Sequence, residues 1–247
     1  MFRKLATALC CLCLAAPVAA LDLNDMSPED RAAFGAAVRS YLLDNPQVIM
    51  DAVAVLEERR AAEQAAADVS LVSDNAQALF EDGFSYVGGN PEGDITVVEF
   101  LDYRCGFCRR AHPEVSKLME SDGNIRLIIK EFPILGDQSV MASRFAVATK
   151  QVAGDDAYKA VSDALIDFTP DITIPALMRI AQNLELDGRA IEAHMNSDTV
   201  SAELQATRSL AQNLQITGTP TFVLHDELLR GYLPYDQMKE IVAEKRE

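Results

Sequence analysis

Residues 95–108 have the sequence ITVVEFLDYRCGFC, in which a run of β-branched and aromatic residues leads directly into two cysteines. The run from 95 to 103 predicts a buried strand, because such side chains fit a covered, pleated surface. Residues from about 108 to 120 have helical periodicity, and residues 124–132 predict a second strand. The cysteines are therefore expected in a β-α-β unit, at the carboxyl end of a strand and the start of a helix.

The pair Cys105 and Cys108 has the spacing that disulfide exchange requires. The two residues between them form about one helical turn, so the two sulfurs can meet. The dipole and the free backbone N–H groups at a helix N-terminus lower the pKa of the first cysteine. We therefore predict Cys105 as the exposed nucleophile and Cys108 as the more buried resolving thiol. Their redox-active disulfide needs no separate cofactor.

Metal binding is the usual alternative for a CxxC sequence. Zinc would need two further ligands. The soft donors elsewhere in the chain are His112, His194 and His225, and no second CxxC sequence is present. A structural metal site is therefore disfavoured.

Glu99 is a charged residue within the first predicted strand. Both faces of that strand are expected to be covered, and a buried charge is costly unless it has a partner or a role. Glu99 precedes Cys105 by six residues, so it could lie beneath the cysteine turn and shuttle a proton for Cys108. The alternative is a carboxylate at the strand edge that faces solvent.

A proline precedes a later predicted strand, in the sequence Thr217-Gly218-Thr219-Pro220-Thr221. Cis peptide bonds occur almost only before proline, and a cis Pro220 would leave the Thr219 backbone free to pair with an extended substrate. Composition alone favours an ordinary loop proline.

Four basic side chains flank the cysteines. His112 lies one turn after Cys108 and could tune the thiol, although a surface histidine is the simpler interpretation. Arg104, Arg109 and Arg110 could favour the thiolate, or could be solvated surface charges.

The start of the chain has the pattern of a signal peptide. Residues 1–20 combine a short positive start, an apolar run and small residues at the end, with cleavage expected after about Ala20. The protein is therefore expected in the periplasm, where disulfides persist. The mature chain would retain only Cys105 and Cys108, which close too short a loop to stabilise a fold, so we infer a chemical role. The net charge of −16 argues against a nucleic-acid partner.

Residues 21–84 predict a helical extension. Ser27-Pro28 begins a helix to Leu43, Pro46 begins a second, and Ser73 could cap a third that runs to Phe80. The apolar stripe of this extension must bury itself against the main domain or against another copy, and both alternatives remain open.

The remaining residues complete the predicted order of elements. Residues 137–215 show only helical periodicity, two strands are expected near 221–224 and 228–231, and a last helix spans 235–245. Taken together, the motifs resemble the DsbA family over about residues 86–245. The residues that carry this resemblance are Gly89-Asn90-Pro91, the stretch 96–108, Phe132-Pro133, and Gly218-Thr219-Pro220-Thr221-Phe222.

The resemblance implies an α/β fold: a thioredoxin fold with an inserted helical subdomain at about 137–215, preceded by an N-terminal helical extension. The expected domains are residues 1–20, 21–84 and 85–247. The resemblance also implies a cis Pro220 facing Cys105, a nucleophile at Cys105, a resolving thiol at Cys108 and a buried acid at Glu99. Substrate contacts are expected at Thr219, Pro220, Gly106 and Phe107.

The chain departs from the family's best-known oxidases, which carry Pro-His where this sequence has Gly106-Phe107. The extension resembles that of ScsC-type proteins, some of which oligomerise and act as isomerases or in copper tolerance. Thr219 before the proline is also frequent among isomerase-type members.

The expected function is an exported thiol–disulfide oxidoreductase, an oxidase or an isomerase. Its partners would be unfolded or misoxidised exported proteins, a membrane redox protein and, through residues 21–84, other copies of the chain. One alternative is a copper(I)-binding protein that uses Cys105, Cys108 and His112. Another is an oligomeric chaperone or scaffold.

Overall fold

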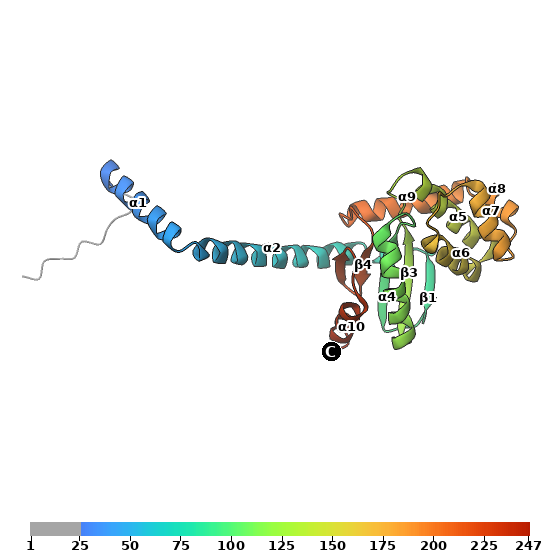
Figure 1. Ribbon diagram of the computed structural model, residues 1–247. Helices are drawn as coiled ribbons and strands as arrows, with labels where there is room; N and C mark the ends of the chain where they lie inside the picture. The colour runs from blue at the N-terminus through green and yellow to red at the C-terminus, as the bar shows by residue number, and fades with distance from the viewer. Residues whose placement is uncertain (1–25) are drawn as a thin grey trace, which may run out of the picture. The chain divides into compact units, whose positions relative to one another are not determined.

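The computed structural model describes residues 26–247 (Figure 1). The expected signal peptide, residues 1–20, lies outside them. The described chain forms two compact units, residues 26–59 and residues 60–247. Within residues 26–247, no helix combines the length and hydrophobicity needed to cross a membrane.

The first unit consists of helix α1 (Pro28–Asp44) and the beginning of helix α2 (Gln47–Asp74). Ser27 caps α1 as expected, because its side chain accepts a hydrogen bond from the backbone N–H of Asp30 at 3.1 Å. None of the residues of α1 is buried. The exposed large apolar side chains of this unit are Phe34, Val38, Tyr41, Leu43, Val48, Ile49, Met50, Val53, Val55 and Leu56.

Helix α2 is longer than the sequence predicts. It continues through an alanine-rich segment that contains no glycine or proline, so nothing interrupts the helix before Asp74. The expected cap at Ser73 is therefore wrong. The short helix α3 (Ala76–Phe80) follows Asn75 instead.

The second unit is built on a five-stranded sheet with the order β1-β3-β2-β4-β5. The strands are β1 (Tyr86–Gly89), β2 (Ile95–Leu101), β3 (Ile125–Glu131), β4 (Thr221–Leu224) and β5 (Glu227–Arg230). Strands β2 and β3 are parallel and are joined by helix α4 (Gly106–Asp122), which confirms the predicted β-α-β unit. Strand β1 was not expected, because its glycines favour a turn. It pairs antiparallel with β3.

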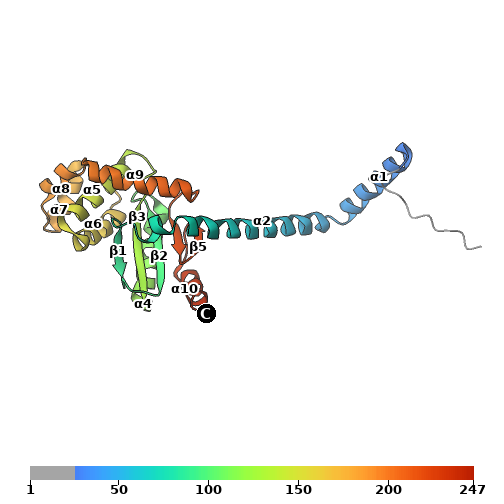
Figure 2. The same ribbon diagram turned by 180° about the vertical axis from the view of Figure 1, so that it is seen from behind.

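Helices cover both faces of the sheet. Helix α4 and the last helix, α10 (Tyr235–Glu244), pack on one face through residues such as Val115, Leu118 and Met238. The other face packs against the end of α2, α3 and helix α9 (Asp198–Asn213), through Val72 and Leu79 among others. Figure 1 shows α4 in front of the sheet, and Figure 2 shows α9 on its opposite side. Strand β2 is therefore covered on both faces, as expected.

Between β3 and β4 the chain is helical, as predicted. Helices α5 (Asp137–Ala153), α6 (Asp155–Asp167), α7 (Ile174–Asn183) and α8 (Gly188–His194) form the inserted subdomain with part of α9. Helix α6 contacts both α4 and β1. The insertion therefore borders the same face of the sheet as the cysteine helix.

The boundary between the compact units lies at residues 59 and 60, not at the expected 84 and 85. Residues 60–84 pack against the sheet and are held there by ion pairs. Arg230 of β5 binds Asp68 of α2 with two hydrogen bonds of 2.6 and 2.9 Å. The fully buried Lys130 of β3 binds Asp82. Part of the predicted extension thus belongs to the unit that contains the sheet, because Val72 and Leu79 are buried there.

Candidate active site

The two cysteines occupy the first turn of α4. Cys105 is the N-cap residue of that helix, with extended backbone angles, and Cys108 lies within its first turn. The turn before them is fixed by the buried Asp102, whose carboxylate accepts hydrogen bonds from the backbone N–H groups of Arg104, Ile134 and Leu135 at 2.8, 2.8 and 3.0 Å. Sequence reasoning missed Asp102. The one feature of the sequence that indicates this role is the position of Asp102, an acidic residue at the turn that directly follows a predicted strand.

Both cysteines are reduced in the structure. Cys105 is 6% exposed and Cys108 is 0% exposed, so the resolving thiol is the more buried one, as expected. Cys105 is therefore less exposed than the sequence predicts for the nucleophile. Cys105 packs against the loop before β4, where its sulfur lies 3.1 Å from the carbonyl oxygen of Thr219.

The environment of Cys105 favours its thiolate. The thiol of Cys108 donates a hydrogen bond to its sulfur and lowers the pKa most. Burial opposes this shift. The side chain of Thr219 and the backbone N–H groups of Cys108 and Phe107 assist it, and together they lower the pKa of Cys105 to about 5. The same hydrogen bond between the two thiols, together with burial, raises the pKa of Cys108. One thiol is therefore ready to ionise while the other holds its proton.

Glu99 lies on β2 and is 4% exposed, so the alternative of a solvent-facing carboxylate is wrong. Burial raises its pKa to about 8, and the charges of Glu131 and Cys105 add to this effect. Its negative charge in turn contributes to the raised pKa of Cys108. A carboxyl with this pKa can both give and take a proton near neutral pH.

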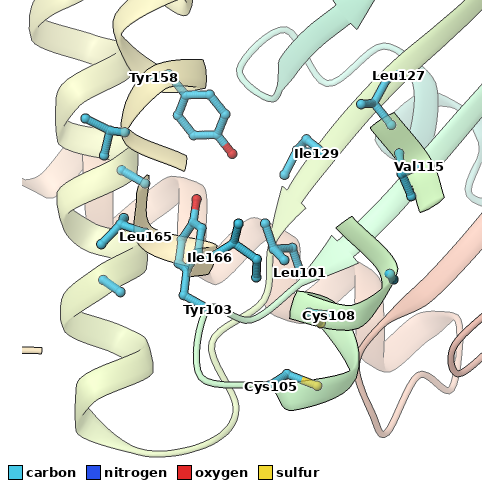
Figure 3. Close-up of a cluster of buried hydrophobic side chains, with 14 of the residues drawn as sticks. Leu101, Tyr103, Cys105, Cys108, Val115, Leu127, Ile129, Tyr158, Leu165 and Ile166 are labelled. Carbon is cyan, nitrogen blue, oxygen red and sulfur yellow. The ribbon is translucent and has the colours of Figure 1, made fainter. Parts of the chain in front are cut away.

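A second buried carboxyl, Glu131, lies at the end of β3. The hydroxyl groups of Tyr103 and Tyr158 donate hydrogen bonds to one of its oxygens at 2.5 and 2.7 Å, and Tyr103 also contacts Ser162 at 3.0 Å. Burial raises the pKa of Glu131 to about 7. Figure 3 shows Tyr103 between the cysteine turn and Tyr158. The sequence analysis did not predict this cluster of buried polar side chains. Its only trace in the sequence is a charged residue, Glu131, within a predicted strand.

The Thr219–Pro220 peptide bond is cis, which confirms the expectation from the family resemblance and overturns the ordinary loop proline. Its loop faces Cys105 through the contact with Thr219. Of the two residues between the cysteines, Gly106 is exposed and Phe107 is 60% exposed. Thr219 thus lies beside the Cys105 sulfur, Pro220 follows it in the same loop, and Gly106 and Phe107 follow Cys105 in the chain.

The three arginines near the cysteines bind other groups. Arg104 donates to the carbonyl oxygens of Thr169 and Pro170 at 3.2 and 2.9 Å. Arg109 donates to the carbonyl of Ile166 at 2.8 Å. Arg110 lies 4.3 Å above the ring of Tyr232. The guanidinium groups of Arg104 and Arg109 thus hold the inserted subdomain against the cysteine helix.

His112 lies beside α6, where its Nε2 is 3.4 Å from the carboxylate of Asp163. Burial lowers its pKa. Among residues 26–247, no three His, Cys, Asp or Glu side chains gather as a metal-binding group. The structure therefore does not bring Cys105, Cys108 and His112 together as the three ligands of the copper(I) alternative.

Two family profiles match the chain. One, described as thioredoxin, matches residues 81–244. The other, described as the N-terminal domain of copper resistance protein ScsC, matches residues 30–63.

Solved structures show the same architecture. A thioredoxin-like oxidoreductase from Silicibacter pomeroyi DSS-3 is 39% identical, with a TM-score of 0.65 over 69% of this chain and 96% of that one. ScsC from Proteus mirabilis in a transitional conformation is 26% identical, with a TM-score of 0.65 over 89% of this chain and 98% of that one. The thiol–disulfide exchange protein α-DsbA2 from Wolbachia pipientis shares the fold. It is 24% identical, with a TM-score of 0.68 over 72% of this chain and 96% of that one.

Curated relatives include the Na⁺/H⁺ antiporter NhaA 3 of Salinispora tropica, 27% identical over 61% of this chain. The match spans only 23% of that relative's length. Disulfide bond formation protein D of Bacillus subtilis is 22% identical over 64% of this chain and 75% of its own. From the matched family and the shared architecture we conclude that the chain belongs to the thioredoxin family, among its DsbA- and ScsC-like thioredoxin-fold oxidoreductases.

Proposed function

We propose that the protein exchanges disulfides with exported protein substrates through Cys105 and Cys108. The observation that carries this proposal is the Cys105 sulfur, which is held at the start of α4 beside the cis Thr219–Pro220 bond, with its pKa lowered to about 5. A thiolate is both the attacking and the leaving group of disulfide exchange. The site therefore favours the chemistry at Cys105 and protects Cys108.

The exchange starts from the disulfide form. A substrate thiolate attacks the Cys105 sulfur, the bond between Cys105 and Cys108 breaks, and Cys108 leaves with the electron pair and takes a proton from Glu99. A second substrate thiolate then attacks the substrate sulfur of the mixed disulfide, and Cys105 leaves as a thiolate. The substrate gains a disulfide and the protein becomes a dithiol. The low pKa of Cys105 speeds the last step, because a weakly basic thiolate leaves faster.

Substrate binding would use the loop that contains the cis proline. The Thr219 backbone could pair with an extended substrate chain, as in strand addition. Phe107 offers an exposed apolar surface next to the reactive sulfur. Apart from its chain neighbours and the backbone of its own helix, no atom lies within 4 Å of a Cβ added at Gly106, so a substrate can approach that backbone closely. These features suit unfolded chains with apolar residues near their cysteines.

The low pKa of Cys105 supports an oxidase. A stabilised thiolate makes the dithiol form favourable, and the disulfide form is then a stronger oxidant. A membrane redox partner would restore the disulfide. We place this reaction in the periplasm, because residues 1–20 have a signal-peptide pattern and disulfides persist in that compartment.

An isomerase is the second candidate, and the exposed apolar side chains of residues 34–56 support it. Such side chains on a helical extension are expected to bury themselves against other copies of the chain. An assembly that presents several Cys105 thiolates could attack wrong disulfides and release them again. The pair would then be kept reduced.

Two assays run side by side test the proposal. The full chain and Cys105→Ser are given a reduced substrate in one assay and a scrambled, multiply bonded substrate in a glutathione buffer in the other. Oxidation of the reduced substrate without recovery of the scrambled one indicates an oxidase. Recovery of the scrambled substrate indicates an isomerase. Equal activity of Cys105→Ser and the unmodified protein in both assays would refute the proposal.

A further inference from the structure

Glu131 is a buried carboxyl to which the proposed exchange gives no chemical step. It is the last residue of β3 and is 4% exposed. Its Oε1 atom accepts two hydrogen bonds, from the hydroxyl group of Tyr103 at 2.5 Å and from that of Tyr158 at 2.7 Å. Burying a carboxyl costs free energy that its hydrogen bonds must offset. The two phenol groups are therefore the first place to look for its role.

Tyr103 belongs to the turn that leads from β2 into the cysteine helix. It is fully buried and precedes Cys105 by two residues. Its oxygen also lies 3.0 Å from the hydroxyl oxygen of Ser162 on α6. Figure 3 shows the hydroxyl groups of Tyr103 and Tyr158 directed toward the same space beside α6. The end of β3 and helix α6 thus hold the Tyr103 side chain together.

The two neighbours of Tyr103 in the turn are anchored as well. The carboxylate of Asp102 binds backbone N–H groups of the loop that follows β3. The guanidinium group of Arg104 binds carbonyl oxygens of the loop that follows α6. Three consecutive side chains therefore fix the turn, and the partners of Tyr103 are side chains, which a substitution can remove one at a time.

The position of this turn determines how Cys105 meets its own partners. The backbone N–H of Cys105 donates to the carbonyl oxygen of Asp102 at 3.0 Å. The thiol of Cys108 and the backbone N–H groups at the start of α4 lower the pKa of Cys105 through hydrogen bonds to its sulfur. Hydrogen bonds weaken steeply when their distance and angle change. A displaced turn would therefore weaken the stabilisation of the Cys105 thiolate.

We propose that Glu131 is a positioning residue of the redox site: its Oε1 atom holds the Tyr103 hydroxyl, and Tyr103 holds the turn that presents Cys105. The proposal rests on the proposed disulfide exchange and adds a residue to the same site. No bond forms or breaks at Glu131 during the exchange. A carboxyl keeps an acceptor oxygen whether it is ionised or protonated, so Glu131 can hold Tyr103 on both sides of its pKa of about 7.

A charge effect of Glu131 is the competing explanation, because its charge adds to the raised pKa of Glu99. Two substitutions separate the charge from the hydrogen bond. Glu131→Gln removes the charge but keeps an oxygen that can accept from Tyr103. Tyr103→Phe keeps the charge but removes the hydrogen bond. Positioning predicts that the second substitution disturbs Cys105 more than the first, and a charge effect predicts the reverse.

The test measures two properties of the full chain. One is the alkylation rate of Cys105 in the reduced protein from about pH 3.5 to 8, and the other is the equilibrium with glutathione at pH 7. The variants are Tyr103→Phe, Glu131→Gln and Glu131→Leu. Tyr158→Phe is the matched control, because Tyr158 donates to the same oxygen of Glu131 from α6 and not from the cysteine turn. Urea unfolding gives the stability that each substitution removes.

We expect Tyr103→Phe and Glu131→Leu to raise the pH midpoint of alkylation by about one unit from its value near 5. The glutathione equilibrium should shift about tenfold toward the disulfide form, since one unit in the pKa of Cys105 changes the relative stability of its thiolate tenfold. Glu131→Gln should recover most of what Glu131→Leu loses. Tyr158→Phe should keep the midpoint and the equilibrium, even if it lowers the urea midpoint as much as Tyr103→Phe does.

Three results would overturn the positioning role. An unchanged alkylation midpoint and an unchanged equilibrium in Tyr103→Phe would do so. Equal shifts in Tyr103→Phe and Tyr158→Phe would attribute the effect to lost stability alone. Shifts in both Glu131 variants without one in Tyr103→Phe would attribute it to the charge.

Two further outcomes are kept apart from these. If Glu131→Leu does not fold, the comparison of Tyr103→Phe with Tyr158→Phe decides the question by itself. Failure of the unmodified protein to oxidise a reduced peptide would refute the proposed function. The alkylation midpoints need no protein substrate, so they would still test whether Tyr103 positions Cys105.

Discussion

Replacing Glu99 by glutamine should stabilise the protein increasingly as the pH rises. The buried carboxyl has a pKa of about 8 in the folded protein against an ordinary value of 4.5. Between these two values the folded protein keeps the Glu99 proton, whereas the unfolded chain releases it. Folding stability must therefore fall as the pH rises through this window. A glutamine side chain carries no proton that can be lost, so the Glu99→Gln protein should escape that fall.

The structure sets the size of the effect. Each pH unit between the two pKa values corresponds to about 1.4 kcal/mol, which gives an upper limit of about 5 kcal/mol at pH 8. The effective dielectric constant of a protein interior is higher than that of a dry apolar medium and reduces this penalty, so we expect about 2 to 5 kcal/mol. Glu131, with a pKa of about 7, changes stability in the same direction, but it is present in both proteins and largely cancels in the comparison.

The assay is urea unfolding of both proteins at half-unit steps from pH 4.5 to 8.5, with the cysteines kept reduced. Glu244→Gln, a change at an exposed glutamate of α10, is the matched control. The difference in unfolding free energy between Glu99→Gln and the unmodified protein should grow with pH and level off above about 8. A difference that is constant across this range would refute the reasoning, because Glu99 would then not be held protonated by burial.

Three further predictions concern other parts of the molecule. The alkylation rate of Cys105 should be nearly constant above about pH 6 and half of its maximum near pH 5, because its pKa is about 5; a midpoint near pH 9 would contradict the stabilised thiolate. Asp68→Ala should lower the unfolding free energy by about 1 to 3 kcal/mol, because Arg230 loses a partner that accepts two hydrogen bonds. The same change should speed hydrogen exchange in residues 60–74. Unchanged protection of these residues would contradict the role of this ion pair. Light scattering of the full chain should give a multiple of the monomer mass, and Leu56→Asp should reduce it, because that exposed side chain belongs to the apolar surface of the extension; a monomeric unmodified protein would exclude this assembly.

Features determined by neighbouring residues were predictable from the sequence. The β2 strand, the cysteine turn and the N-terminus of α4 follow from β-branched residues next to a CxxC pair, and the structure has them in that order. The helical insertion follows from its periodicity. Strand β1 was not predictable, because its pairing with β3 outweighs the turn preference of its glycines.

The tertiary structure alone decided which buried groups surround the reactive sulfur. Thr219 is 114 residues from Cys105, and Tyr103 and Tyr158 lie 28 and 27 residues from the Glu131 that they bind. No local sequence pattern predicts contacts between residues so far apart in the chain. These contacts depend on how α6 and the proline loop pack on the sheet. The sequence by itself determined the pair of thiols, their helix and the acid beneath them, because strand and helix-start signals are local. Packing determined how deeply Cys105 and Glu99 are buried and which charges they meet, and these set their pKa values.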